Sequence, residues 1–259
     1  ERERAQDLAH QIEAARQSEQ LRTTLIDAMV HEFKTPLTAI RAATTALLAN
    51  PEQSPETSSE MLTIADEEAA HLAEFIDNAV EMARLDNAHI EVHLEQSDLC
   101  QVVRDVVASM RGEIEDRTVT VECCETIPRI ALDPRWMKLA VKQLLDNALK
   151  YSPAGTPVKI LLSLSDDAVT VGICNQGEGI PLKEQERIFE RFYRSPSVRH
   201  QIPGSGLGLS IASSIVRAHE GTLTLTSSSG ETTFRIALPS KKIEMDTEPE
   251  PQTIQRQPS

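Results

Sequence analysis

Two amphipathic segments joined by a short proline-containing loop constrain the fold of this chain most strongly. In the second segment, apolar residues recur at spacings of three and four over three heptads: Leu62, Ala65, Ala69, Leu72, Ile76, Ala79 and Ala83. The first segment carries the same spacing at Ile26, Met29, Phe33, Leu37, Ile40, Thr44 and Leu47. The sequence therefore predicts a hairpin of two long helices, the first of which ends near Asn50-Pro51.

The predicted hairpin has one apolar stripe on each helix and no further helix before the first strand to cover both stripes. We therefore expect it to complete its core by dimerising into a four-helix bundle. Thr57 and Glu60, in capping-box spacing just before Met61, predict the start of the second helix. Residues 1–21 are charged, rich in Ala and Gln, and free of Gly and Pro, as is typical of an incoming helix or coiled-coil connector.

After Asn87 the pattern changes to alternating strands and helices. Strands are predicted at 89–95, 118–124, 129–133, 158–164, 168–174, 222–227 and 232–239, and helices at 98–112, 134–152 and 207–220. Several neighbouring strands are joined by hairpin-length turns, so an α/β sandwich with a mixed sheet fits better than a doubly wound parallel sheet. The predicted organisation is therefore a connector, a helical hairpin, an α/β domain and a tail of disorder-like composition, at 1–21, 22–88, 89–240 and 241–259.

Bulk composition excludes several classes of protein. The net charge of −14 argues against nucleic acid as the main partner, because a phosphate backbone requires a basic footprint. The four cysteines lack zinc-ligand spacing, so free thiols in a reducing cytoplasm are expected. No apolar run is long enough to span a bilayer and no signal peptide is visible. Because the chain opens without Met inside an apparent helix, we expect a cytoplasmic fragment of a longer protein, which could be anchored in a membrane.

Reactive side chains are concentrated in "HEFKTPL" at 31–37, within the first predicted helix. At about 100° per residue, His31 faces away from the apolar stripe, Thr35 lies one turn further along the same face, and Glu32 flanks the imidazole. Pro36 cannot donate a hydrogen bond to the carbonyl of residue 32, so the helix should bend or loosen there. The segment predicts a solvent-facing imidazole on a rigid support.

Two further motifs have residues suited to bind phosphate and a planar ligand. In "QLLDNALKYSP" at 143–153, Asn147 lies one turn before Tyr151 with Lys150 between them, which offers an oxygen ligand for Mg²⁺ and a cation for phosphates. In "NQGEGIP" at 175–181, Gly177 and Gly179 follow a predicted strand and let the backbone approach a flat ligand.

A third motif and the segment before it complete the set. "GSGLGLSIA" at 204–212 feeds glycines into a helix N-terminus, where free N–H groups attract phosphate. For "ERIFERFYR" at 186–194, the family resemblance described next implies a mobile lid anchored by Phe189 and Phe192, with Arg191 and Arg194 as candidate phosphate contacts.

Taken in order, these five motifs resemble the H, N, G1, F and G2 boxes of sensor histidine kinases of two-component systems, over roughly residues 22–240. The resemblance implies a Bergerat-type ATP-binding domain tethered to a dimeric phosphotransfer bundle. It also implies an Mg²⁺ site at Asn147 with Gln143. The implied ATP-binding residues are Asn147, Lys150, Tyr151, Asn175, Gly177, Gly179, Ile180, Phe189, Phe192, Arg194, Gly204, Ser205, Gly206, Leu207 and Gly208.

The resemblance further implies a mechanism. His31 would attack the γ-phosphate of Mg²⁺–ATP, with Glu32 accepting a hydrogen bond from the other ring nitrogen. The phosphoryl group would then pass to an aspartate of a response regulator, under the control of a sensor domain upstream of residue 1. Thr35 stands where the family has its phosphatase hydroxyl.

Two positions depart from the family pattern. Asn175 replaces the usual Asp of the G1 box, and its amide oxygen can still accept a hydrogen bond from the adenine amino group, with weaker affinity. Gln143 replaces an Asn, which leaves its role at the metal open. The alternatives are an ATP-gated clamp of the Hsp90/MutL class and a dimeric scaffold whose nucleotide site has decayed.

Overall fold

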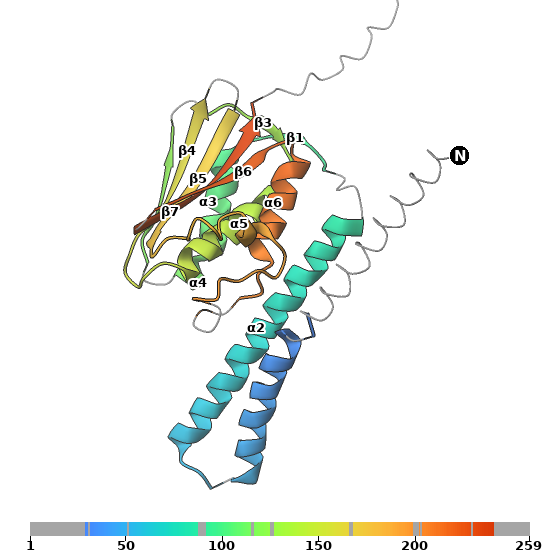
Figure 1. Ribbon diagram of the computed structural model, residues 1–259, viewed down its shortest axis with the longest axis vertical. Helices are drawn as coiled ribbons and strands as arrows, with labels where there is room; N and C mark the ends of the chain where they lie inside the picture. The colour runs from blue at the N-terminus through green and yellow to red at the C-terminus, as the bar shows by residue number, and fades with distance from the viewer. Residues whose placement is uncertain are drawn as a thin grey trace, which may run out of the picture.

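The computed structural model describes residues 29–30, 32–50, 52–87, 92–114, 117–124, 127–165, 168–198, 202, 204–228 and 230–240. A long helical hairpin leads into an α/β domain, and the upper half of the hairpin lies against that domain (Figure 1). The predicted connector, the predicted tail and His31 lie outside the described residues. None of the described helices is both long and apolar enough to cross a bilayer.

The hairpin consists of a first helix, described over 29–30 and 32–49, and α2 (Pro55–Asn87). The predicted stop near Asn50 is confirmed. The predicted cap of α2 is wrong, because Ser54 accepts a hydrogen bond at Oγ from the Thr57 amide, 3.2 Å away, so Thr57 lies inside the helix. Pro55 suits the first turn since an amide hydrogen there has no carbonyl within the helix to bind.

The buried face of the first helix agrees with the predicted stripe at Phe33, Ile40 and Leu47, which are half-buried, and lies one residue away from it at two positions. Pro36 and Ala43 are buried, whereas Leu37 is 52 % exposed and Thr44 is exposed. Spacings of three and four through Pro36 and Ala43 satisfy a helix as well as those through Leu37 and Thr44, so periodicity alone could not choose. The helix is unbroken over 32–49, so Pro36 does not interrupt it.

The predicted stripe of α2 is divided between two faces. Leu62 and Ile76 of that stripe are 58 % and 45 % exposed, whereas the buried Phe75 and Met82 lie outside it. The hairpin thus leaves a row of large apolar side chains in solvent, with Val30, Leu37 and Leu48 on the first helix and Leu62, Ile76 and Val80 on α2. A single chain has nothing among its described residues to cover this row, as expected for a hairpin that pairs with a partner.

The α/β domain is built on a five-stranded sheet in the order β2-β4-β5-β7-β6. Its strands are β2 (Val119–Cys123), β4 (Val158–Ser165), β5 (Ala168–Gly177), β6 (Thr222–Ser228) and β7 (Gly230–Pro239). β2 and β4 are parallel and the other pairs are antiparallel, so the predicted mixed sheet is confirmed. β1 (Glu95–Ser97) and β3 (Ile130–Leu132) form a separate pair. The strand predicted at 89–95 is wrong over 92–94, which have no regular structure.

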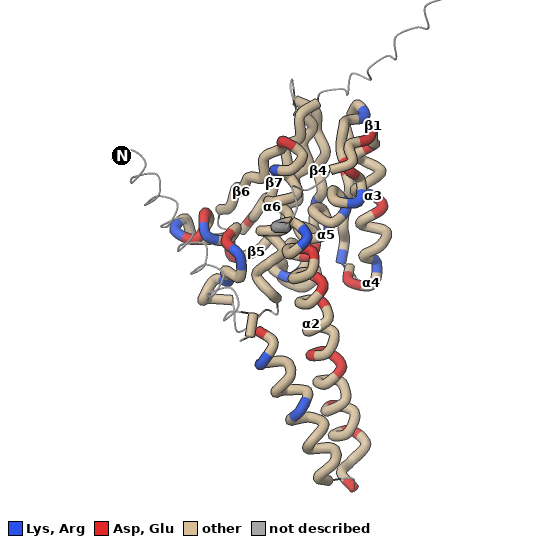
Figure 2. Tube along the Cα trace, turned by 90° about the vertical axis from the view of Figure 1, so that its right-hand side faces the viewer, with Lys and Arg blue, Asp and Glu red and all other residues tan. Residues whose placement is uncertain are grey.

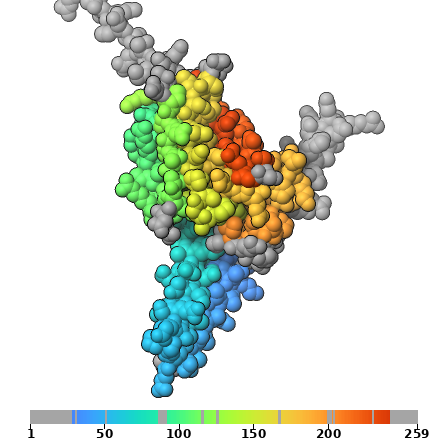
Figure 3. Space-filling view, turned by 90° about the vertical axis from the view of Figure 1, so that its left-hand side faces the viewer, coloured from blue at the N-terminus to red at the C-terminus, as the bar shows by residue number. Residues whose placement is uncertain are grey.

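The predicted helices are confirmed as α3 (Leu99–Ser109), α5 (Pro134–Lys150) and α6 (Gly208–Ala218), joined by the short α4 (Arg111–Ile114) and a 3₁₀ turn, η1 (Arg187–Phe189). Helices cover one face of the sheet (Figure 1), and the opposite face is seen in Figure 3. The alternation along β4 follows from this arrangement, because Ile160 and Leu162 are buried while Leu161 between them is 43 % exposed.

A buried polar link fixes the start of α5 to the end of α6. Asp133 accepts hydrogen bonds at Oδ1 from the amides of Arg135 and Trp136, at 3.0 and 3.3 Å. Its own amide donates to Nε2 of His219, 3.0 Å away, so Nδ1 carries the proton and donates to the Ile215 carbonyl at 2.8 Å. Both side chains are buried. The link holds in register the two helices that flank the cavity described below.

We expect Asp133→Ala to lower the free energy of unfolding by about 2–3 kcal/mol, because it removes a helix cap and leaves partly buried amides unpaired. These include the amide of His93, which donates to Oδ2 at 3.1 Å. Asp98→Ala is the matched control, since Asp98 caps α3 through one amide, that of Gln101 at 3.1 Å. It should cost about 1 kcal/mol. Urea titration followed by circular dichroism measures both, and equal losses would contradict the larger role of Asp133.

Candidate functional site

A cavity of about 470 Å³ lies where α5, the sheet, the 178–206 segment and α2 meet. It brings together residues of four predicted motifs that are far apart in the sequence. From the sequence-predicted set, the lining includes Gln143, Asn147, Lys150, Tyr151, Asn175, Gly177, Gly179, Ile180, Arg194, Gly204, Ser205, Gly206 and Gly208. The N, G1, F and G2 motifs therefore share one cavity.

Four predicted contact residues do not line the cavity: Phe189, Arg191, Phe192 and Leu207. Phe189 packs edge-on against Phe234 with ring centroids 6.3 Å apart. Leu207 is fully buried at the start of α6. Phe192 has a positive φ of 59° and its ring lies 6.4 Å from that of Phe75 on α2. These apolar side chains support the walls of the cavity from behind, because each fills a neighbouring core.

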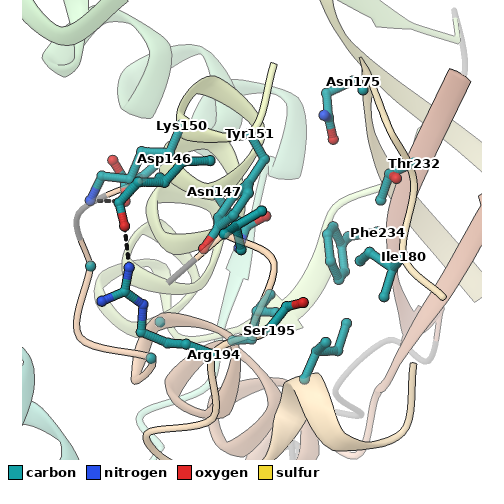
Figure 4. A pocket seen from close by; sticks show the side chains of 18 of the residues that line it. Asp146, Asn147, Lys150, Tyr151, Asn175, Ile180, Arg194, Ser195, Thr232 and Phe234 are labelled. Carbon is teal, nitrogen blue, oxygen red and sulfur yellow. Dashed lines mark hydrogen bonds and ion pairs between the residues drawn. The ribbon is translucent and has the colours of Figure 1, made fainter. Parts of the chain in front are cut away.

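Asn175 lies on the sheet side of the cavity and is 3 % exposed. Its Nδ2 donates to the Gln176 carbonyl at 3.1 Å. That bond fixes the orientation of the amide and leaves Oδ1 with no protein donor among the described residues. Figure 4 shows Asn175 and Thr232 opposite Asn147 on α5. A buried carbonyl oxygen in this position is suited to accept a hydrogen bond from a ligand amino group.

Two glycines of the cavity are required by the backbone around them. Gly179 has a φ of 81°, and a Cβ there would lie 2.6 Å from the Ser228 carbonyl oxygen. Gly206 has a φ of 69°, and its Cβ would lie 2.8 Å from the carbonyl carbon of Phe192. The sequence-based reason for glycine was close approach to a ligand, but the closest atoms belong to the neighbouring backbone.

Lys150 and two carboxylates form a charged cluster at one end of the cavity. The Lys150 Nζ lies 2.8 Å from Asp146 and 2.9 Å from Glu74 of α2. Burial raises the pKa of Asp146. Burial alone would lower the pKa of Lys150, but the charges of Asp146 and Glu74 outweigh it and raise that pKa. Figure 4 shows Arg194 at the same end. A phosphate entering here would compete with the carboxylates for Lys150.

The wall contributed by α2 could not be predicted from the sequence. Gln143 donates from Nε2 to Oδ1 of Asn78 at 2.8 Å, which ties α5 to α2. Glu74 and Asn78 belong to no motif and lie more than sixty residues from their partners, so no local signal marks them. Asp146 was also missed, although it lies within the N motif and could have been found there.

Asn147 is the residue best suited to a divalent cation. It is half-buried in the cavity lining, and its side chain has no hydrogen-bond partner among the described residues. Gln143 is committed to Asn78 through its amide nitrogen. Within the described part of the chain no group of three His, Cys, Asp or Glu residues could hold a metal. This donor set fits Mg²⁺, which commonly takes few protein ligands and completes its shell with phosphate oxygens and water.

The predicted phospho-accepting segment lies on the first helix and outside the cavity lining. Glu32 is half-buried, and Thr35 is exposed one turn further on. His31 lies outside the described residues. Phe33, two residues from it, packs edge-on against Phe75 with centroids 4.8 Å apart. The segment is thus linked to the cavity wall through α2.

Two domain families match this chain. Residues 21–88 match the His Kinase A (phospho-acceptor) domain, and residues 132–242 match the histidine kinase-, DNA gyrase B- and HSP90-like ATPase family. The chain belongs to the sensor histidine kinases, and the site described above lies in its ATP-binding domain.

Individual relatives agree with this assignment. The sensor histidine kinase CusS of Escherichia coli K12 is 32 % identical over 212 residues, which are 82 % of this chain and 44 % of CusS. The sensor-like histidine kinase SenX3 of Mycolicibacterium smegmatis is 30 % identical over 81 % of this chain and 55 % of its own length. The chain thus spans about half the length of these relatives.

Solved structures show the same architecture. The mycobacterial sensor histidine kinase MprB is 31 % identical over 58 % of this chain and 99 % of the solved chain, with a TM-score of 0.51. The Acinetobacter baumannii histidine kinase AdeS, at 20 % identity, has a TM-score of 0.64 over 82 % of this chain and 98 % of that one. At that identity, AdeS supports the fold alone.

We expect Gly179→Ala to weaken binding of a non-hydrolysable ATP analogue at least about tenfold, because its Cβ would displace the backbone at Ser228 and reshape the cavity. Gly112→Ala is the matched control, since Gly112 lies in α4 with nothing within 4 Å of its Cβ position. Isothermal titration calorimetry measures both affinities. Tight binding by Gly179→Ala would contradict this role.

Proposed function

We propose that this chain uses Mg²⁺–ATP to phosphorylate His31 and passes the phosphoryl group to an aspartate of a response regulator. One observation carries the proposal: one cavity is lined by an amide whose oxygen can accept a hydrogen bond, a second amide suited to bind a metal ion, and a lysine. These are Asn175, Asn147 and Lys150. The family match supports the same reaction class.

The residues at the two ends of the cavity indicate how the nucleotide would be oriented. Adenine would bind on the sheet side, where the Asn175 oxygen can accept from its amino group. The phosphates would lie at the other end, near Lys150 and Arg194. No side chain caps the N-terminus of α6, so the amides of its first turn are available to an anion.

We assign Mg²⁺ to Asn147, shared with phosphate oxygens, and assign Gln143 to the contact with α2. When bound, the ion would neutralise charge on the triphosphate. Asn147 would orient the phosphate chain and Lys150 would offset its remaining charge. A neutral His31 would attack the γ-phosphorus in line as the bond to the β-γ bridging oxygen breaks and ADP leaves. Glu32 would accept a hydrogen bond from the other ring nitrogen.

The exposed apolar row of the hairpin supports a homodimer. Leu62, Ile76 and Val80 are each more than two-fifths exposed, at 58 %, 45 % and 45 %. Burying them against a second hairpin would give a four-helix bundle. A response regulator would dock on the same bundle, and Thr35, exposed on the first helix, could orient water for the reverse reaction. ThkA, a neighbour of 21 % identity with a TM-score of 0.67, was solved in complex with its response regulator TrrA.

The rival functions have less support. An ATP-gated clamp of the Hsp90/MutL class would share the nucleotide cavity, but the match of residues 21–88 to a phospho-acceptor domain favours a kinase. The hypothesis of a scaffold with a decayed nucleotide site is supported only by the two departures from the family pattern, Asn175 and Gln143. Asn175 keeps a hydrogen-bond acceptor in the cavity lining, and Gln143 forms a hydrogen bond with Asn78 of α2.

Incubation with γ-labelled ATP should leave acid-labile, base-stable label on the chain. His31→Gln should abolish this label, because the glutamine amide is not a nucleophile. His71→Gln, on α2 and outside the cavity lining, should retain it. Label that persists in His31→Gln would refute the assignment. Release of free phosphate without label would indicate the clamp.

We expect Glu74→Gln to tighten ATP binding about three- to tenfold. To reach the phosphates, Lys150 would then give up a contact with a neutral amide instead of an ion pair with a carboxylate. Asp77→Asn is the control, since Asp77 is exposed on the same helix and does not line the cavity. Equilibrium titration with a fluorescent ATP analogue tests both. An unchanged affinity in Glu74→Gln would show that the ion pair does not compete with phosphate.

A further inference from the structure

A second groove, of about 280 Å³, lies between α3 and α4 on one side and the edge strand β2 on the other. It shares no residue with the ATP cavity. Figure 2 shows α3 and α4 at the margin of the domain, with Lys or Arg on both. The lining of this β2 groove combines aliphatic side chains with arginines: Arg104, Val107, Ala108, Arg111, Ile114, Arg117, Val119 and Val121.

The strand beside the groove has backbone groups that are not used by the sheet. β2 is the last strand on its side of the sheet, so one of its edges has no neighbouring strand among the described residues. The Cys124 amide donates to the Leu162 carbonyl of β4 at 3.2 Å, which identifies the even-numbered residues as those that bond to β4. The amides and carbonyls of Val119, Val121 and Cys123 therefore point away from β4. An edge of this kind can pair with a further strand.

The groove and the open edge coincide at two valines. Val119 and Val121 line the groove with their side chains and contribute backbone groups to the edge. Their side chains face the helices, because they pair with the buried Val158 and Ile160 of β4 and paired residues share a face. A strand added at this edge would therefore place every second side chain in the groove.

Two arginines at the groove have no described acidic partner. Arg104 and Arg111 are exposed, and neither forms an ion pair or a side-chain hydrogen bond among the described residues. Asp105, the acid of α3, is paired with Lys138 at 2.7 Å. Arg117 donates to backbone carbonyls instead. Guanidinium groups bind carboxylates strongly, so the charge of this surface favours an acidic partner.

The spacing of these arginines suits an extended partner. α3 and α4 are nearly continuous, since the Ile114 amide donates to the Met110 carbonyl at 2.9 Å. Arg104 and Arg111 are two helical turns apart, so they share a side of the helix and lie about 10 Å apart along its axis. Two carboxylates on one face of an extended chain, four residues apart, are separated by about 13 Å, a distance that flexible arginine side chains can match. Val107 lies between the arginines and lines the groove, so the residue between the acids should be apolar.

We propose that the β2 groove binds an extended segment of a partner protein that carries an acidic, an apolar and an acidic residue on one face. The segment pairs with the open edge at Val119, Val121 and Cys123. Its apolar side chain lies against the aliphatic lining, and its carboxylates bind Arg104 and Arg111. Because the groove and the ATP cavity share no residue, a partner bound here leaves the nucleotide cavity open.

A synthetic peptide with blocked ends tests this docking on the full chain. In this probe, threonine alternates with glutamate, valine and glutamate, so that the two acids and the valine share one face. Fluorescence anisotropy of the labelled probe should show saturable binding. Arg104→Gln/Arg111→Gln, or glutamine in place of both glutamates of the probe, should weaken binding at least about tenfold. The matched control Arg217→Gln/Arg235→Gln, at exposed positions on α6 and β7, should bind as the unmodified chain does.

Methylation of the probe's amide nitrogens distinguishes strand pairing from attraction between charges. Methyl groups on one alternate set of amides should abolish binding and those on the other set should preserve it, because only one set of an added strand faces β2. Hydrogen–deuterium exchange of residues 119–123 should slow at least about fivefold when the probe binds. Exchange in α5 should be the same in the unmodified chain and in Arg104→Gln/Arg111→Gln, which controls for a folding defect.

Four outcomes would overturn the proposal. The first is an absence of saturable binding up to about 1 mM probe, the limit of weak specific association. The second is equal binding by the glutamine probe, and the third is equal loss of binding with either methylated set. The fourth is slowed exchange at the opposite edge strand β6 instead of residues 119–123, which would place the peptide on another surface.

Discussion

The ring of Phe75 joins the two parts of the chain. It is 4 % exposed, with Phe33 of the first helix on one side and Phe192 of the ATP-binding domain on the other. Phe33 is two residues from His31, and Phe192 directly precedes Tyr193, Arg194 and Ser195, which line the nucleotide cavity. Because this packing is apolar and non-directional, it brings the phospho-acceptor helix and the cavity together without fixing their rotation. Catalysis needs such freedom, since the histidine has to approach the γ-phosphate.

Polar contacts beside this ring orient α2 on the ATP-binding domain and determine which charges are paired in the cavity. The amide pair Gln143–Asn78 orients α2 on α5, and Glu74 holds Lys150 with Asp146. In this arrangement the lysine that would bind phosphate is already neutralised by carboxylates. With the role proposed for Lys150, nucleotide binding and the position of α2 would be coupled, because both would use the same ammonium group. A signal that moves α2 along the hairpin would change the charge that the triphosphate meets.

Most of the fold was predictable, and the failures have identifiable causes. The alternation in β4 and β5 and the capping Asp98 gave strands and a helix close to their observed bounds, because these signals are local. The predicted stripe of the first helix was wrong at two positions, since Pro36 and Leu37 both satisfy helical spacing and only the partner helix selects one. The cap of α2 was misplaced because Ser54 with Pro55 competes with Thr57. Glu74 and Asn78 were not predictable, because their contacts join distant parts of the chain.

The sequence by itself determined the class of the protein and the inventory of its site: the motif around His31, the amides Asn147 and Asn175, and the glycines at 177, 179 and 206. Residue type and spacing are sufficient there, because hydrogen-bond capacity and backbone freedom are properties of single residues. Only the tertiary structure decided that Lys150 is held by Glu74 and that Gln143 faces Asn78. Those outcomes depend on which surfaces pack together, and packing is decided by the whole chain.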